Sequence, residues 1–99
     1  MMVIEKKLEG KSATLAVVGR LDTQTAPELE KELDATFLGL QALTFDMSGL
    51  EYISSAGLRV ILKAQKVMNK QGAMKLVGVS GSIMEVFEIT GFVDILTIE

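Results

Sequence analysis

Two patterns of apolar residues alternate along the chain. Continuous or alternating apolar runs are typical of β-strands, whereas apolar residues that recur every three or four positions mark one face of a helix. The strand-like runs cover residues 2–8, 13–18, 42–46, 75–79 and 93–98. Helical spacing begins near Thr25, Ser55 and Ser82 and ends near Gly39, Lys70 and Gly91. The sequence therefore predicts the element order β-β-α-β-α-β-α-β.

Local signals support these boundaries. Residues 9–11 read as the turn of a hairpin between the first two strands. Thr25 with Glu28, and Ser82 with Glu85, each fit a capping box at a helix start. Strands that alternate with helices after a hairpin imply an α/β fold with a mainly parallel sheet and right-handed crossovers.

We expect one domain over residues 1–99, since this length supports a single small core. The run at 13–18 is the more continuous of the first two apolar runs, with Leu15, Val17 and Val18, and predicts a strand that is covered on both faces. In such sheets, ligands and partners meet the loops at the carboxyl ends of the strands. Residues 19–25 and 48–55 both follow predicted strands, so we expect both loops at that edge.

The segment from Asp46 to Leu62 carries the most distinctive polar residues. Ser54 and Ser55 fall where a helix begins, a place where a side-chain oxygen often accepts a free backbone N–H. The simplest interpretation is a helix cap. The same place suits a phosphate, because free N–H groups and the helix dipole favour negative charge. Ala56 and Gly57 lack bulk, which would let another molecule approach the first turn closely.

Composition removes several classes of function. The net charge of −3 disfavours nucleic-acid binding, which requires a basic surface. The absence of histidine excludes a Ser-His-Asp triad and histidine zinc ligands. The absence of cysteine excludes disulfides and thiol chemistry and fits a cytoplasmic protein. No apolar run approaches the ~20 residues of a membrane span, and the N-terminus lacks the order of a signal peptide. We therefore expect no membrane association.

Three motifs run through the chain. They are Gly19-Arg-Leu-Asp with Thr25-Ala-Pro-Glu-Leu, then Asp46-Met-Ser-Gly-Leu-Glu-Tyr-Ile-Ser-Ser-Ala-Gly-Leu, and finally Thr90-Gly-Phe-Val-Asp-Ile-Leu. Together they resemble the STAS domain of bacterial anti-sigma factor antagonists. The resemblance implies the element order given above, with the helices largely on one face of the sheet.

The resemblance also implies a regulatory protein rather than an enzyme, with no cofactor and no metal. In the family, the serine that matches Ser55 is phosphorylated by a partner kinase that is itself the anti-sigma factor. The unphosphorylated protein would bind this partner and free a sigma factor, and phosphorylation would switch binding off. The family often has Asp where this chain has Ser54, which makes Ser54 the alternative phosphoacceptor. The partner-binding or nucleotide-facing edge would comprise Asp22, Thr23, Asp46, Ser48, Ser54, Gly57 and Arg59.

Simpler or different interpretations remain open for several of these residues. Asp22 and Asp46 can each be turn residues that accept hydrogen bonds from their own backbone. The basic stripe of the helix from Ser55, which includes Arg59, can be an ordinary solvated face or can meet an acidic partner. An enzyme or phosphoryl carrier with Ser55 as nucleophile would need an aspartate as base, which is weak near neutral pH. A STAS module in another signalling assembly is a further alternative.

Overall fold

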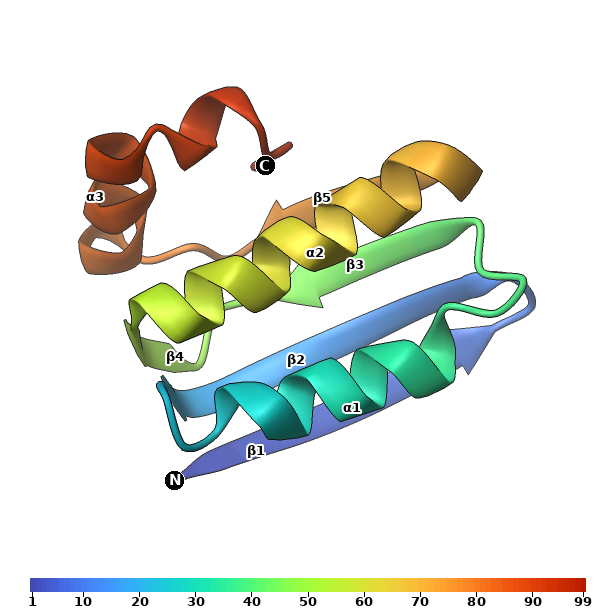
Figure 1. The fold of residues 1–99 in the computed structure, drawn as a ribbon, viewed down its shortest axis with the longest axis horizontal. Coiled ribbons are helices and arrows are strands. Elements are labelled where there is room, and N and C mark those ends of the chain that lie inside the picture. Colours follow the sequence, from blue (N-terminus) through green and yellow to red (C-terminus); the bar gives the residue numbers. More distant parts are fainter.

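The computed structural model describes all 99 residues as one α/β domain (Figure 1). The elements in chain order are β1 (Met2–Glu9), β2 (Ser12–Leu21), α1 (Ala26–Thr36), β3 (Ala42–Asp46), β4 (Leu50–Ile53), α2 (Ser55–Gln71), β5 (Ala73–Val77), α3 (Gly81–Thr90) and a 3-10 turn, η1 (Phe92–Asp94).

The strands form a mixed, mainly parallel sheet, as predicted. Their order in the sheet is β1-β2-β3-β5, and β4 pairs with β2 outside this path. β1 and β2 make the expected antiparallel hairpin, whereas β2 with β3 and β3 with β5 are parallel. β5 begins and ends two residues earlier than predicted. It ends at Val77 because Gly78 turns the chain away with a φ of 68°.

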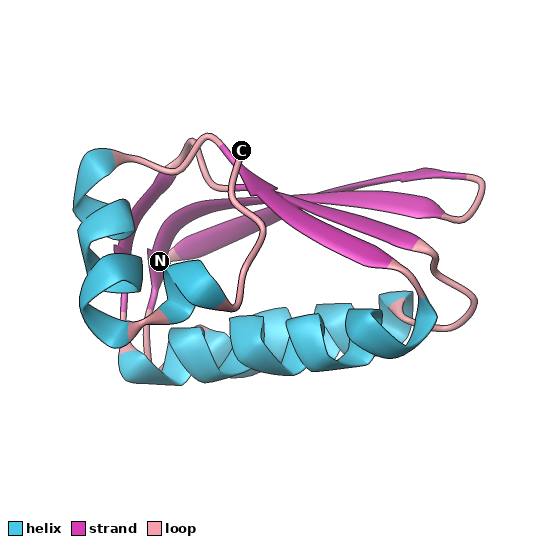
Figure 2. Cartoon of the chain, turned by 90° about the horizontal axis from the view of Figure 1, so that it is seen from above, coloured by secondary structure: helices cyan, strands magenta, loops and turns pink.

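α1 and α2 lie side by side across one face of the sheet, and α3 stands at its end next to β4 (Figures 1 and 2). The core lies between this helical layer and the sheet, and its fully buried large side chains include Leu15, Phe45, Ile61, Leu76 and Phe87. The opposite face of the sheet is open. The prediction that the strand at 13–18 is covered on both faces is therefore wrong: its residues alternate between buried and partly exposed.

β4 is an element that the sequence pattern did not predict. β3 pairs with the first half of β2 and ends at Asp46. The chain pairs with β2 again from Leu50, and β4 lies beside the end of β2, from Gly19 to Leu21. In β4 only the two end residues, Leu50 and Ile53, are buried. A four-residue strand with this burial has no alternating pattern, which is why the sequence predicts a loop here.

The predicted last strand at 93–98 is also wrong. After Gly91, which ends α3 with a φ of 79° as expected, the chain forms η1. The N–H groups of Ile95 and Leu96 donate to the Phe92 carbonyl, so these residues curl rather than extend. Only an isolated parallel bridge between Ile98 and Leu76 joins this segment to the sheet.

Neither predicted capping box forms. α1 begins after Thr25 and α3 after Ser80, and neither residue caps its helix with a side-chain hydrogen bond. The Thr25 hydroxyl instead serves the turn that precedes α1.

Candidate functional site: the edge at the ends of β2 and β4

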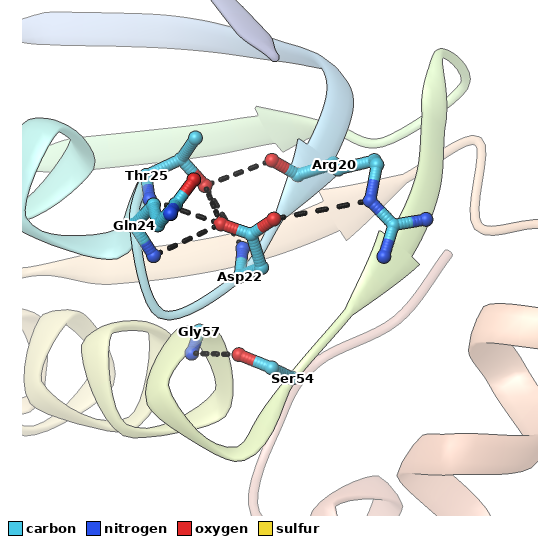
Figure 3. Close-up of polar contacts among 6 residues, drawn as sticks. All are labelled: Arg20, Asp22, Gln24, Thr25, Ser54 and Gly57. Carbon is cyan, nitrogen blue, oxygen red and sulfur yellow. Dashed lines mark hydrogen bonds and ion pairs between the residues drawn. The ribbon is translucent and has the colours of Figure 1, made fainter.

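Pairing between β2 and β4 brings two loops together that are 32 residues apart in the sequence. Leu21 is the register partner of Ile53, and the N–H of Ser54 donates to the Leu21 carbonyl at 2.9 Å. Asp22, which follows Leu21, therefore lies beside the start of α2 (Figure 3). The expected proximity of the Asp22 loop and the Ser54–Ser55 segment is observed.

Asp22 organises the turn between β2 and α1. Its Oδ1 atom accepts hydrogen bonds from the backbone N–H of Gln24 at 3.0 Å and of Thr25 at 3.1 Å, and the Thr25 hydroxyl lies 3.2 Å away (Figure 3). These bonds, led by that from the Thr25 N–H, hold the pKa of Asp22 below its usual value. The interpretation of Asp22 as a turn residue is thus confirmed, and a role in recognition stays a prediction.

Arg20 and Tyr52 are neighbours of this turn that the sequence analysis did not single out. They are register partners on β2 and β4, and the Arg20 guanidinium lies 4.2 Å from the centre of the Tyr52 ring. Arg20 Nε also lies 3.8 Å from Oδ2 of Asp22, a loose and half-exposed ion pair (Figure 3). Because β4 was not predicted, no sequence signal placed these two side chains opposite each other.

Ser54 and Ser55 have different roles at the start of α2. Ser54 is the N-cap residue, and its hydroxyl oxygen accepts from the Gly57 N–H at 3.4 Å (Figure 3). Ser55 is the first residue of the helix, is exposed, and its hydroxyl makes no hydrogen bond within the chain. Capping therefore accounts for Ser54, whereas the exposed Ser55 hydroxyl has no structural role within the chain.

Gly57 does not have the position expected for it. It is buried, and a Cβ atom built on it would lie 2.7 Å from Cγ of Leu21 and 3.0 Å from Cγ1 of Ile53. The absence of a side chain therefore lets the first turn of α2 pack against the ends of β2 and β4. Gly57 is therefore part of the packing beneath this edge and is not exposed to a partner.

Thr23 and Arg59 lie on the helical side of the same edge. Together with Ala56 they line a shallow groove of about 340 Å³ between the first turns of α1 and α2. Arg59 is exposed and has no carboxylate within ion-pair distance. Glu30, which also lines the groove, is bonded to Lys63 at 2.7 Å.

Asp46 and Ser48 form a separate pair. Oδ1 of Asp46 accepts from the backbone N–H of Ser48 at 3.0 Å and from its hydroxyl at 2.7 Å, which together lower the Asp46 pKa. Asp46 alternates with the buried Phe45 and so faces the open side of the sheet. Neither residue hydrogen-bonds to the Asp22 turn or to α2. The turn interpretation of Asp46 is confirmed, and the structure does not join this pair to the Asp22–Ser55 edge as the sequence analysis expected.

No cluster of three or more histidine, cysteine, aspartate or glutamate side chains is arranged to hold a metal ion. None of the helices has the length and apolar character required to cross a membrane.

Comparison with known proteins identifies the family to which this chain belongs. The sequence model of the STAS domain matches residues 4–99. The chain belongs to the STAS domain family. Within it, the chain is 34% identical to the anti-sigma-B factor antagonist of Listeria monocytogenes over 84% of this chain and 75% of the relative. It is 32% identical to the anti-sigma-B factor antagonist of Staphylococcus aureus, over 94% of this chain and 88% of the relative.

Solved structures agree on the fold of this STAS domain. An anti-sigma factor antagonist from Mycobacterium paratuberculosis superposes with a TM-score of 0.89 at 21% identity, over 99% of this chain and 85% of the other. The antagonist SpoIIAA, in its unphosphorylated form, gives a TM-score of 0.77 at 13% identity, over 100% and 87% of the two chains. The chain is thus a STAS domain of the anti-sigma factor antagonist family, whose members are regulators and not enzymes.

Proposed function

We propose that this STAS domain is a partner switch controlled by phosphorylation of Ser55. In the unmodified state it binds an anti-sigma factor with serine kinase activity and so frees a sigma factor in the cytoplasm. Phosphorylation of Ser55 ends this binding. The proposal rests on the difference between the two serines at the start of α2. Ser54 caps the helix, whereas the exposed Ser55 hydroxyl has no hydrogen-bond partner in the chain.

The surroundings of Ser55 support a binding role more than a catalytic one. The nearby carboxylate of Asp22 accepts hydrogen bonds from its own turn and has a lowered pKa, so it is a poor general base. The relatives named above are antagonists of anti-sigma factors, and SpoIIAA has been solved in phosphorylated as well as unphosphorylated form. A phosphoserine adds about −1.5 to −2 charge at neutral pH, which is disruptive in a packed interface.

The proposal is tested with the cognate anti-sigma factor kinase and ATP. Peptide mass mapping of the wild-type protein should find one phosphate, on Ser55. Ser55→Ala should abolish it and Ser54→Ala should not, although loss of the cap should cost about 1 kcal/mol of stability. Ser80→Ala is a matched control, because Ser80 also precedes a helix and is exposed.

Calorimetric titration then compares the two forms of the protein. The unphosphorylated form should bind the partner, and the phosphorylated form should bind about a hundredfold more weakly, which corresponds to roughly 3 kcal/mol. Circular dichroism should show the same fold for both forms. Phosphate found on Ser54 in place of Ser55, or equal affinity of both forms, would refute the proposal.

A further inference from the structure

α2 is the basic element of an acidic protein. It carries Arg59, Lys63, Lys66 and Lys70 and no aspartate or glutamate, whereas the whole chain has a net charge of −3. These cations differ in what they contact. Lys63 Nζ is held by Glu30 at 2.7 Å and by Asp34 at 3.1 Å on α1. Arg59, Lys66 and Lys70 have no carboxylate within ion-pair distance.

Arg59 is the free cation nearest to Ser55. It follows Ser55 by four residues, so the two side chains share one face of the helix with their Cβ atoms about 6 Å apart. Long side chains in a helix point back toward its N-terminus, which directs the guanidinium of Arg59 along the first turn. Lys66 follows Ser55 by 11 residues, or about 16 Å along the helix axis, which places Ser55 beyond the reach of the Lys66 side chain.

The other cation at this edge is already engaged. Arg20 stacks on Tyr52 and lies near the Asp22 carboxylate, on the side of the sheet that the helices do not cover. Arg59 instead lines the groove beside Ala56, which directly follows Ser55. The Ser55 hydroxyl has no hydrogen bond that would have to break before a group attached to it could turn toward Arg59.

We infer that Arg59 binds the phosphate group when Ser55 is phosphorylated. The inference rests on the proposed function for the choice of Ser55. A guanidinium presents a planar fork of N–H donors that matches two phosphate oxygens, and the free N–H groups of the first helical turn favour the same charge. Phosphorylation thereby alters two features of the surface at once. It adds a dianion at Ser55, and it occupies the only cation that lines the groove between α1 and α2.

The test needs no partner protein. Phosphoserine is incorporated at position 55 during synthesis, and the second pKa of its phosphate, ordinarily about 6, is measured by phosphorus NMR as a function of pH. A nearby guanidinium favours the dianion and lowers this pKa. Arg59→Gln should therefore raise the pKa by about half a unit, the size expected of an exposed charge pair one turn apart.

Two further variants make the result specific. Lys66→Gln removes the same charge from the same helix and should leave the phosphate pKa unchanged. Arg59→Lys keeps a charge without the fork and should give an intermediate value. Equal phosphate pKa values in the wild-type and Arg59→Gln proteins, with circular dichroism showing both folded, would overturn the inference. Because no kinase is used, that outcome would leave the Ser55 switch standing, whereas failure of the switch appears only in the mass mapping and calorimetry.

Discussion

Gly57 offers a sharp test of how the edge is built. Gly57 is helical and does not have a left-handed φ, so alanine can adopt its backbone conformation without strain. Alanine is favoured over glycine within a helix by about 1 kcal/mol, and propensity alone predicts that Gly57→Ala stabilises the protein. The packing predicts the opposite, because the new methyl group would lie 2.7 Å from Cγ of Leu21 and 3.0 Å from Cγ1 of Ile53.

The magnitude follows from these two opposing effects. Leu21 is fully buried and Ile53 nearly so, and neither can move without disturbing the ends of β2 and β4. Overpacking of this kind typically costs about 1–3 kcal/mol. After the gain in propensity, Gly57→Ala should lower the free energy of unfolding by about 1 kcal/mol, which corresponds to a Tm about 4–8 °C lower for a domain of this size.

Thermal unfolding followed by circular dichroism measures the effect. Gly81→Ala is the matched control, because Gly81 is also helical, lacks a left-handed φ and has no atom within 4 Å of the added Cβ. That variant should melt at or above the wild-type temperature. Leu21→Ala should cost less in the Gly57→Ala background than alone, since it removes Cγ and Cδ2 of Leu21, the atoms that lie nearest to the added methyl group. A Gly57→Ala protein as stable as Gly81→Ala would refute the packing argument.

Two further predictions concern polar side chains. Gln65 is buried, its Nε2 donates to Asn69 at 2.8 Å, and its Oε1 has no hydrogen-bond partner. Because Gln65→Met removes this unpaired buried oxygen, it should leave the Tm equal or higher, and a large drop in Tm would contradict this. Asp22→Asn should lower the Tm slightly at pH 7, because an amide oxygen can accept the same turn bonds but without the charge, yet should slow Ser55 phosphorylation. Since folding lowers the Asp22 pKa from 3.8, its charge stabilises the fold above about pH 4 and ceases to do so as the pH falls through the folded-state pKa. The difference in Tm between wild type and Asp22→Asn should therefore shrink from pH 5 to pH 2, and a difference that grows would show that the charge is not responsible.

Features set by short-range chemistry could be predicted from the sequence. The strand Ala42–Asp46 and the start of α2 at Ser55 appear as expected, because an apolar run that ends in a carboxylate and a serine before a helical pattern are local signals. The hairpin and the parallel order of the later strands follow from element order alone. The turn role of Asp22 also needs only its own neighbours.

Features that depend on contacts between distant segments could not be predicted. β4 exists because Leu50 and Ile53 pack inward beside β2, and nothing within four residues indicates that neighbour. The residues after Gly91 resemble a strand in pattern, but bonds to the Phe92 carbonyl curl them, and the chain meets β5 only at its end, where Thr97 and Glu99 hydrogen-bond to Leu76. The sequence alone suggests that Gly57 leaves the first turn of α2 accessible, but in the structure Leu21 packs against it.

The same long-range pairing supports the proposal that phosphorylation of Ser55 controls binding at this edge without reshaping the fold. Ser55 is positioned by the bond from Ser54 to the Leu21 carbonyl and by the contact of Gly57 with Leu21, and neither involves the Ser55 hydroxyl. A phosphate on that hydroxyl would sit at a helix N-terminus, where negative charge is favourable by about 0.3–1 kcal/mol at an exposed site. We therefore expect phosphorylation of Ser55 to leave the fold unchanged. The unfavourable free energy of the added phosphate would instead weaken the binding of any partner that packs against Ser55. A switch of binding partner requires this property.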